Sequence, residues 1–137
     1  MHIQRLELEG FKTFAKKTVI HFEKGISGVV GSNGSGKSNV VDAIKWVLGE
    51  QSAKSLRGQA MDDVIFMGAE GIEAAKFAHV SLIFSKGDEP FPGLFASLDE
   101  VEVARRLKRS GSSSYYLNRS KVRLRDVQNF FLDTGLS

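Results

Sequence analysis

The chain has no cysteine and only two prolines among its 137 residues. The lack of cysteine excludes a disulfide, a thiolate metal site and a cysteine nucleophile, and it suits a reducing cytosol. No apolar run approaches the length of a membrane span. Arg5, Glu7 and Glu9 interrupt any apolar stretch that could act as a signal peptide. We therefore expect a cytoplasmic protein without a membrane partner, forming one domain or part of one.

Acidic residues are absent from one long segment. Residues 105–125 contain no Asp or Glu, whereas the rest of the chain carries all 16 acids and 11 of the 19 cations. The net charge of +3 therefore hides a strong segregation of charge. The cations of this segment are Arg105, Arg106, Lys108, Arg109, Arg119, Lys121, Arg123 and Arg125. Such a basic stretch in an otherwise acidic chain predicts contact with a polyanion.

The most informative motif that is present is a complete phosphate loop, or Walker A. Its pattern is G-x-x-x-x-G-K-[ST], and the backbone N–H groups of such a loop wrap a polyphosphate. Lys37 is expected to reach the β- and γ-phosphates, and the hydroxyl of Ser38 to ligate Mg²⁺. The loop consists of Gly31, Ser32, Asn33, Gly34, Ser35, Gly36, Lys37 and Ser38. The sequence therefore predicts nucleotide binding.

The flanking pattern supports this motif. The apolar run 26–30 predicts a buried strand before the loop, and helical spacing of apolar residues predicts a helix over 36–48 that ends at Gly49. Further predicted elements are strands at 2–9, 18–22, 78–84, 100–109 and 115–117, a short helix at 52–56, a buried turn or short strand at 64–66, an exposed loop at 85–98 and a helix from 124 to about 135. This order predicts an α/β fold, with a phosphate-loop core and an antiparallel β layer.

A second motif that hydrolysis requires, an acidic one called Walker B, is missing. A Walker B is an apolar strand that ends in Asp, but residues 130–133 fit the end of a helix better, and residues 78–84 run into Ser85 and Lys86. Residues 118–121 do not match the guanine-reading N-K-x-D pattern, so GTP is not favoured. Asp62 and Asp63 could hold a metal, although such a pair more often caps or solvates a turn.

These features have a family counterpart. The chain resembles the N-terminal ATPase half-head of a bacterial structural-maintenance-of-chromosomes (SMC) protein. The resemblance runs nearly from end to end, and the long match beyond the phosphate loop is far more specific than a Walker A alone. The matching segments are 8–14, 34–52, 55–58, 63–66, 109–111, 116–118 and 132–136.

The resemblance implies an architecture that extends beyond this chain. In the SMC family this lobe, of the ABC-ATPase type, is followed by a coiled coil, a hinge and a returning coil, and a C-terminal lobe supplies the signature motif and Walker B. Residues 1–137 are then the N-terminal lobe of a head that binds ATP and Mg²⁺. The implied partners are its own C-terminal lobe, a second copy through the hinge and the ATP-engaged heads, a kleisin-type subunit and double-stranded DNA at the nucleoid.

Several residues carry over from the family by position. Lys12 and Thr13 match a Phe-Lys-Ser-Phe segment near the nucleotide, and Asn39 extends the phosphate site. Arg57 matches an arginine of a loop that approaches the phosphates, where it could act as a finger; alternatively, it is a surface residue after a short helix. The sequence departs from the family at Ser32, which replaces a usual Pro, at Thr13, which keeps the hydroxyl of Ser, and at Met67, which replaces a small residue.

The basic segment is interpreted in this light. Strand alternation would send Arg105, Leu107 and Arg109 to one face, next to the cations of residues 119–125. We expect DNA phosphates to be contacted by Arg105, Arg109, Arg119, Lys121 and Arg123. The alternative is a solvated β edge on which cations block aggregation. Tyr115 and Tyr116 are expected to pack within or across strands.

Four functions remain open from the sequence. The first is the ATP-binding half of a chromosome condensation and partitioning ATPase, active in the full-length protein. The others are the lobe of a related coiled-coil ATPase of recombination or repair, a small free-standing P-loop NTPase, and a nucleotide-dependent DNA-binding module without turnover. Without a Walker B, signature motif or Q-loop, residues 1–137 alone are expected to be essentially inactive.

Overall fold

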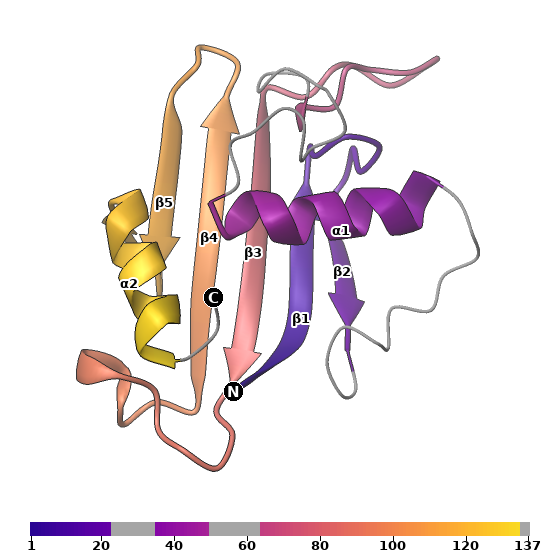
Figure 1. Ribbon diagram of the computed structural model, residues 1–137. Coiled ribbons are helices and arrows are strands. Elements are labelled where there is room, and N and C mark those ends of the chain that lie inside the picture. The colour runs from indigo at the N-terminus through magenta and orange to yellow at the C-terminus, as the bar shows by residue number, and fades with distance from the viewer. Residues whose placement is uncertain (23–34, 50–63, 135–137) are drawn as a thin grey trace.

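The part of the protein that the structure describes is built on one antiparallel sheet. The computed structural model describes residues 1–22, 35–49 and 64–134. The sheet has six strands in the order β2-β1-β3-β4-β5-β6. Figure 1 shows both helices, α1 (Ser35–Val47) and α2 (Leu124–Thr134), on the same face of the sheet. The strands are β1 (His2–Glu9), β2 (Thr18–His21), β3 (Phe77–Ser85), β4 (Glu100–Lys108), β5 (Ser113–Leu117) and β6 (Ser120–Val122).

Alternation along the strands determines which side chains meet the helices. In β4, Val101, Val103 and Leu107 are buried in the apolar core, whereas Glu102 and Arg106 are half-buried on the opposite face. The same alternation in β1 buries Leu6 and Leu8 and turns Glu7 and Glu9 away. One face of the sheet is therefore apolar and covered, and the other is polar, as is usual for an antiparallel sheet.

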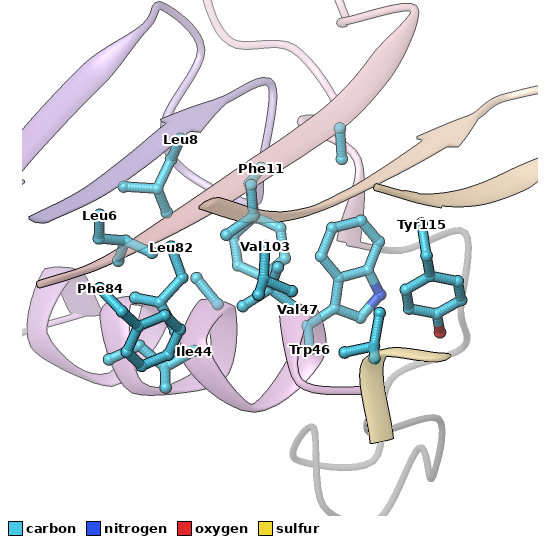
Figure 2. Packing of buried hydrophobic residues seen from close by; sticks show 14 of the residues in the cluster. Leu6, Leu8, Phe11, Ile44, Trp46, Val47, Leu82, Phe84, Val103 and Tyr115 are labelled. Atoms are coloured by element: carbon cyan, nitrogen blue, oxygen red, sulfur yellow. The ribbon is translucent and has the colours of Figure 1, made fainter. Parts of the chain in front are cut away.

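The core lies between the sheet and the helices. Helix α1 crosses β3 and β4, and α2 lies along β5 (Figure 1). Figure 2 shows Ile44, Trp46 and Val47 of α1 among side chains of β1, β3 and β4. From α2, Val127, Phe130 and Phe131 are buried, and the Phe131 and Phe84 rings meet edge to face at 5.4 Å.

Most predicted elements are confirmed. The predicted strands within the described residues, both long helices and the buried segment 64–66 are present, and Ile65 forms a β-bridge to Phe11. Residues 130–133 are helical, so Asp133 does not end a strand. The expected strand at 26–30, the expected short helix at 52–56, Asp62 and Asp63 lie outside the described residues. Among the described residues, no helix is both long and apolar enough to cross a membrane.

The prediction of an exposed loop at 85–98 is wrong in part. Phe91 is only 3% exposed, and its ring lies 6.1 Å from that of Phe130. Phe95, in the short helix η3 (Gly93–Phe95), meets the same ring edge to face at 5.5 Å. The two prolines correctly indicate irregular backbone, but the phenylalanines between and after them cover the apolar side of α2.

Candidate functional site

The predicted phosphate loop leads directly into α1. Residues 31–34, and also Arg57, lie outside the described residues. Ser35, Gly36 and Lys37 begin α1, Ser38 is half-buried and Asn39 is buried. The helix therefore begins where the motif requires, with its N-terminal N–H groups and the positive end of its dipole at the loop.

Residues 10–14, here called the 10–14 loop, pack against the first half of α1. Lys12 Nζ lies 2.6 Å from Asp42 Oδ2, and both side chains are 5% exposed. One helical turn earlier, Asn39 Nδ2 donates a hydrogen bond of 3.0 Å to Thr13 Oγ1. Three residues that the sequence associated with the nucleotide, Lys12, Thr13 and Asn39, thus lie together at the first turns of α1.

The backbone of the 10–14 loop is held on its other side as well. The Lys12 N–H donates to the Val64 carbonyl at 2.6 Å, and the Phe66 N–H donates to the Gly10 carbonyl at 2.8 Å. Gly10 has φ +67°, and a Cβ there would overlap the carbonyl oxygen of Phe77. Only glycine fits this position, because it combines a left-handed φ with a close backbone approach.

Asp42 is the residue of this site that sequence reasoning missed. It stands on the buried face of α1 among Ala43, Trp46 and Val47, where a carboxylate is expensive unless it is paired. A lone acid on the apolar face of a helix was the available signal, and Lys12 is its partner 30 residues away in sequence. The ion pair directs the ammonium of Lys12 onto α1.

The predicted DNA contact by Arg105 is wrong. Its side chain is 2% exposed, and its guanidinium lies 4.5 Å from the centroid of the Trp46 ring and 4.8 Å from that of Tyr115. Nη1 donates to the Trp46 carbonyl at 2.9 Å. Burial lowers the pKa of Arg105, although arginine stays protonated in proteins. The strand turns this side chain toward α1, where it cannot reach a phosphate.

The remaining predicted cations are spread along β4 and the hairpin of β5 and β6. Arg109 is exposed and follows β4, and it donates to the carbonyls of Ala75 at 2.8 Å and Phe66 at 3.1 Å. Arg119 lies beside Glu102 at the beginning of β4, with Nε 3.6 Å from Oε1 and 90% exposure. The length of β4 therefore separates Arg109 from Arg119, whereas Lys121 is level with Ala104 in the middle of β4, through its pairing with Tyr116.

Three cations lie in and beside β6, and they are here called the basic hairpin group: Arg119, Lys121 and Arg123. A two-residue turn joins β5 to β6, with φ +48° at Asn118 and +70° at Arg119. Asn118 Oδ1 accepts a 2.8 Å hydrogen bond from the Glu102 N–H, which fixes the turn against β4. All three cations are exposed and lie within five residues of one another in the sequence.

The polar face of the sheet carries a hollow that sequence reasoning did not identify. Its volume is about 410 Å³, and Ser81 and Ala104 are among the residues that line it. Arg106 Nε donates to His79 Nδ1 at 3.2 Å, and His79 Nε2 lies 3.1 Å from Ser81 Oγ. Burial, and then the charge of Arg106, lower the pKa of His79. Within the described part of the chain, no three His, Asp or Glu residues are grouped to hold a metal.

Comparison with known proteins decides the family. The family model of the RecF/RecN/SMC N terminal domain matches residues 2–137. The chain belongs to this family. The Chromosome partition protein Smc of Halothermothrix orenii is 49% identical over 136 residues, which are 99% of this chain and 11% of that protein.

Solved SMC heads share the fold of this SMC-family chain. One structure, from work on ATP-driven dimerization and DNA-stimulated activation of SMC ATPases, has a TM-score of 0.89 and 40% identity over 100% of this chain and 81% of that chain. The Pyrococcus furiosus Smc head with an extended coiled coil, bound to the C-terminal domain of ScpA, has a TM-score of 0.86 and 40% identity over 99% of this chain and 34% of that chain.

These comparisons confirm the predicted family and fold class. The chain is the N-terminal region of an SMC-type head, with a P-loop fold of the ABC-ATPase type. It spans about a tenth of the length of the curated relatives that it matches. Because the close similarity is to SMC proteins, the comparisons favour the SMC hypothesis over a recombination ATPase or a free-standing NTPase.

Proposed function

We propose that this chain is the ATP-binding half of a head ATPase that partitions chromosomes and engages DNA in an ATP-dependent cycle. The observation that carries the proposal is the junction of the 10–14 loop with α1. Two interactions link this loop to the helix that begins at the phosphate loop. They are the hydrogen bond from Asn39 to Thr13 and the ion pair of Lys12 with Asp42. These two links hold the 10–14 loop against the first half of α1, whose N-terminal amides would bind the phosphates.

We assign roles to individual residues from the motif and, for the 10–14 loop, from its contacts with α1. Backbone amides of residues 31–38 would surround the phosphates, Lys37 would neutralise the β- and γ-phosphates, and Ser38 would ligate Mg²⁺. Asn39 and Thr13 would hold the first turn of α1, and Lys12 would support it through Asp42. Arg57 would approach the phosphates as a finger that stabilises transition-state charge.

The proposed ATPase is complete only with a second lobe. The acid that positions Mg²⁺ and the attacking water would come from a C-terminal head lobe, so residues 1–137 alone would hydrolyse ATP negligibly and bind it weakly. A second copy would join through the hinge and the ATP-engaged heads, and a kleisin-type subunit would bind the assembled head. The relatives described above, with ATP-driven dimerization and with ScpA bound, support these partners.

Duplex DNA is the proposed polyanion. The basic hairpin group is exposed and carries three cations in five residues, and Arg109 offers a further charge at the other end of β4. Such side chains would bind phosphates without reading bases. This function implies a cytoplasmic, nucleoid-associated protein.

The test is nucleotide binding by the full-length protein, measured by calorimetry with a non-hydrolysable ATP analogue and Mg²⁺. Lys37→Ala should reduce affinity at least tenfold. The matched control is Lys45→Ala, because Lys45 is exposed in the last turn of the same helix and should not contribute. Equal affinities of the Lys37→Ala variant and the parent would dismiss the nucleotide site.

A further inference from the structure

Four side chains form a continuous row through the core. The rings of Phe11 and Trp46 are 5.4 Å apart, and the Arg105 guanidinium lies 4.5 Å from Trp46 and 4.8 Å from Tyr115. Figure 2 shows the indole of Trp46 between Phe11 on one side and Tyr115 on the other. The row therefore crosses from the 10–14 loop, under the end of α1, to β5.

The two ends of the row lie at the two proposed binding surfaces. Phe11 is the neighbour of Lys12 and Thr13, which bind α1 close to the phosphate loop. At the other end, Tyr115 is paired with Val122 in the sheet. Val122 lies between Lys121 and Arg123, two members of the basic hairpin group. Arg105, in the middle of the row, is the only buried cation of the basic segment 105–125.

Arginine at position 105 makes contacts that other side chains cannot combine. Its planar guanidinium stacks on aromatic rings and still donates in its own plane, here to the Trp46 carbonyl at 2.9 Å and to Ser113 Oγ at 3.3 Å. The Trp46 carbonyl also accepts from the Gly49 N–H at 3.1 Å. A cation at this carbonyl also complements the negative end of the α1 dipole. Arg105 thereby fastens the C-terminus of α1 to β4 and β5.

We propose that Arg105 is a positioning residue that couples DNA contact at the basic hairpin group to nucleotide binding at the other end of α1. The inference rests on the proposed function, since it needs both ligands. A shift of β5 and β6 on DNA would move Tyr115, and close packing would pass that movement through Arg105 and Trp46 to α1 and the 10–14 loop. By linkage, nucleotide would tighten DNA binding by the same factor as DNA tightens nucleotide binding.

The experiment measures this factor in the full-length protein. Affinity for a non-hydrolysable ATP analogue is determined with and without saturating blunt duplex DNA, and the ratio of the two is the coupling. Couplings between sites are typically about 5- to 150-fold. We expect a ratio of at least about fivefold in the parent, and a ratio near one in Arg105→Lys and Arg105→Met, with affinity in the absence of DNA changed less than the ratio.

Arg106→Met is the matched control. Arg106 is the next residue of β4, also stacks on an aromatic ring, at 4.4 Å from Phe77, and points to the opposite face of the sheet outside the row. This variant should keep the parental ratio. A merely structural Arg105 would lower the unfolding midpoint and leave the ratio unchanged, so an unchanged ratio in folded Arg105 variants overturns the inference.

Three further outcomes are also decisive. If both Arg105 variants fail to fold, Tyr115→Leu interrupts the same row one residue further on, and it should lower the ratio; a parental ratio in that variant would reject the coupling role. A parent that binds both ATP analogue and DNA with a ratio of one also rejects it, and leaves the proposed function intact. A parent that binds neither ligand rejects the proposed function itself.

Discussion

Lys12 Nζ and Asp42 Oδ2 are 2.6 Å apart, and each of the two side chains is only 5% exposed. The pair joins the 10–14 loop to α1 across 30 residues of sequence. Removing one partner from a buried ion pair leaves an uncompensated charge, which costs about 3–5 kcal/mol. We therefore expect Asp42→Ala to lower the free energy of unfolding by that amount, as measured by urea denaturation.

Replacement of both partners separates charge pairing from packing. The double variant Lys12→Met, Asp42→Leu should recover most of the loss, since apolar residues of similar size often replace buried pairs without penalty. The exposed pair of Lys86 and Asp99, 3.9 Å apart, is the control; Asp99→Ala should cost at most about 1 kcal/mol. Equal losses for Asp42→Ala and Asp99→Ala would contradict the importance of the buried pair.

Gly49 is favoured at the end of α1 by its backbone conformation and, to a smaller extent, by its surroundings. Its φ of +104° disfavours any residue with a Cβ, and a Cβ there would lie 2.7 Å from Leu124 Cδ1 of α2. Gly49→Ala should therefore lower the free energy of unfolding by about 1–3 kcal/mol from backbone strain, and by a smaller further amount from the contact, because the end of the Leu124 side chain can shift.

A matched glycine and a double variant divide these two contributions. Gly111 has a similar φ of +97° and open space around the position of a Cβ, so Gly111→Ala reports backbone strain alone. The loss of unfolding free energy in Gly49→Ala should exceed the loss in Gly111→Ala. Addition of Leu124→Ala should remove this excess, which a double-mutant cycle would detect as a favourable coupling energy. A Gly49→Ala loss no larger than that of Gly111→Ala would exclude the steric contribution.

Local patterns predicted the elements well but did not determine their surroundings. Alternation correctly placed Arg105 on the same face as Leu107, yet it could not say that this face lies under α1 rather than in solvent. The answer depends on the aromatic rings of Trp46 and Tyr115, which surround the guanidinium. Charge segregation identified the basic segment, but only the fold separates buried Arg105 from exposed Lys121.

The candidate site was predictable where a motif is contiguous and unpredictable where it depends on tertiary contact. The sequence pattern of a strand, a glycine loop and a helix predicted that α1 begins at the phosphate loop. Asp42 was not predicted, because its partner lies in a different element and only folding brings the two together. Phe91 was assigned to an exposed loop for the same reason, since the ring of Phe130 that it covers is 39 residues away in sequence.

His79 should make stability depend on pH. Burial and, to a smaller extent, Arg106 hold the pKa of His79 below its ordinary value of 6.5, against weaker opposing effects of Glu102, Glu9 and Glu7. The unfolded chain then binds the proton more tightly than the folded chain, so the contribution of His79 to stability is complete above pH 6.5 and is lost as pH falls through the folded pKa.

The measurement combines denaturation with titration. The urea midpoint should fall between pH 7 and pH 5, and His79→Gln should reduce that fall by removing the group that titrates. Arg106→Gln should raise the pKa of His79 in an NMR titration of the imidazole protons, since it removes a neighbouring positive charge. A pKa of His79 at or above 6.5 in the parent would reject this explanation.

The basic hairpin group should determine affinity for DNA through charge alone. Each phosphate contact contributes about 0.9 to the slope of log affinity against log salt. The triple variant Arg119→Glu, Lys121→Glu, Arg123→Glu should therefore weaken binding of every duplex sequence alike and reduce the slope by about 2–3. Arg109 is left unchanged because its hydrogen bonds to Ala75 and Phe66 would confuse charge with local structure.

A second triple variant has the same net charge as the first, but its three substitutions lie elsewhere in the chain. Lys16, Lys45 and Lys86 are exposed and lie outside the basic segment, so Lys16→Glu, Lys45→Glu, Lys86→Glu changes net charge by the same amount. Binding is measured by fluorescence anisotropy at several salt concentrations, on variants with parental melting temperatures. If contact is specific to the hairpin, only the first triple variant lowers the slope. An equal loss in both variants would mean that net charge governs binding, and that the cations around β6 serve only to solvate a sheet edge.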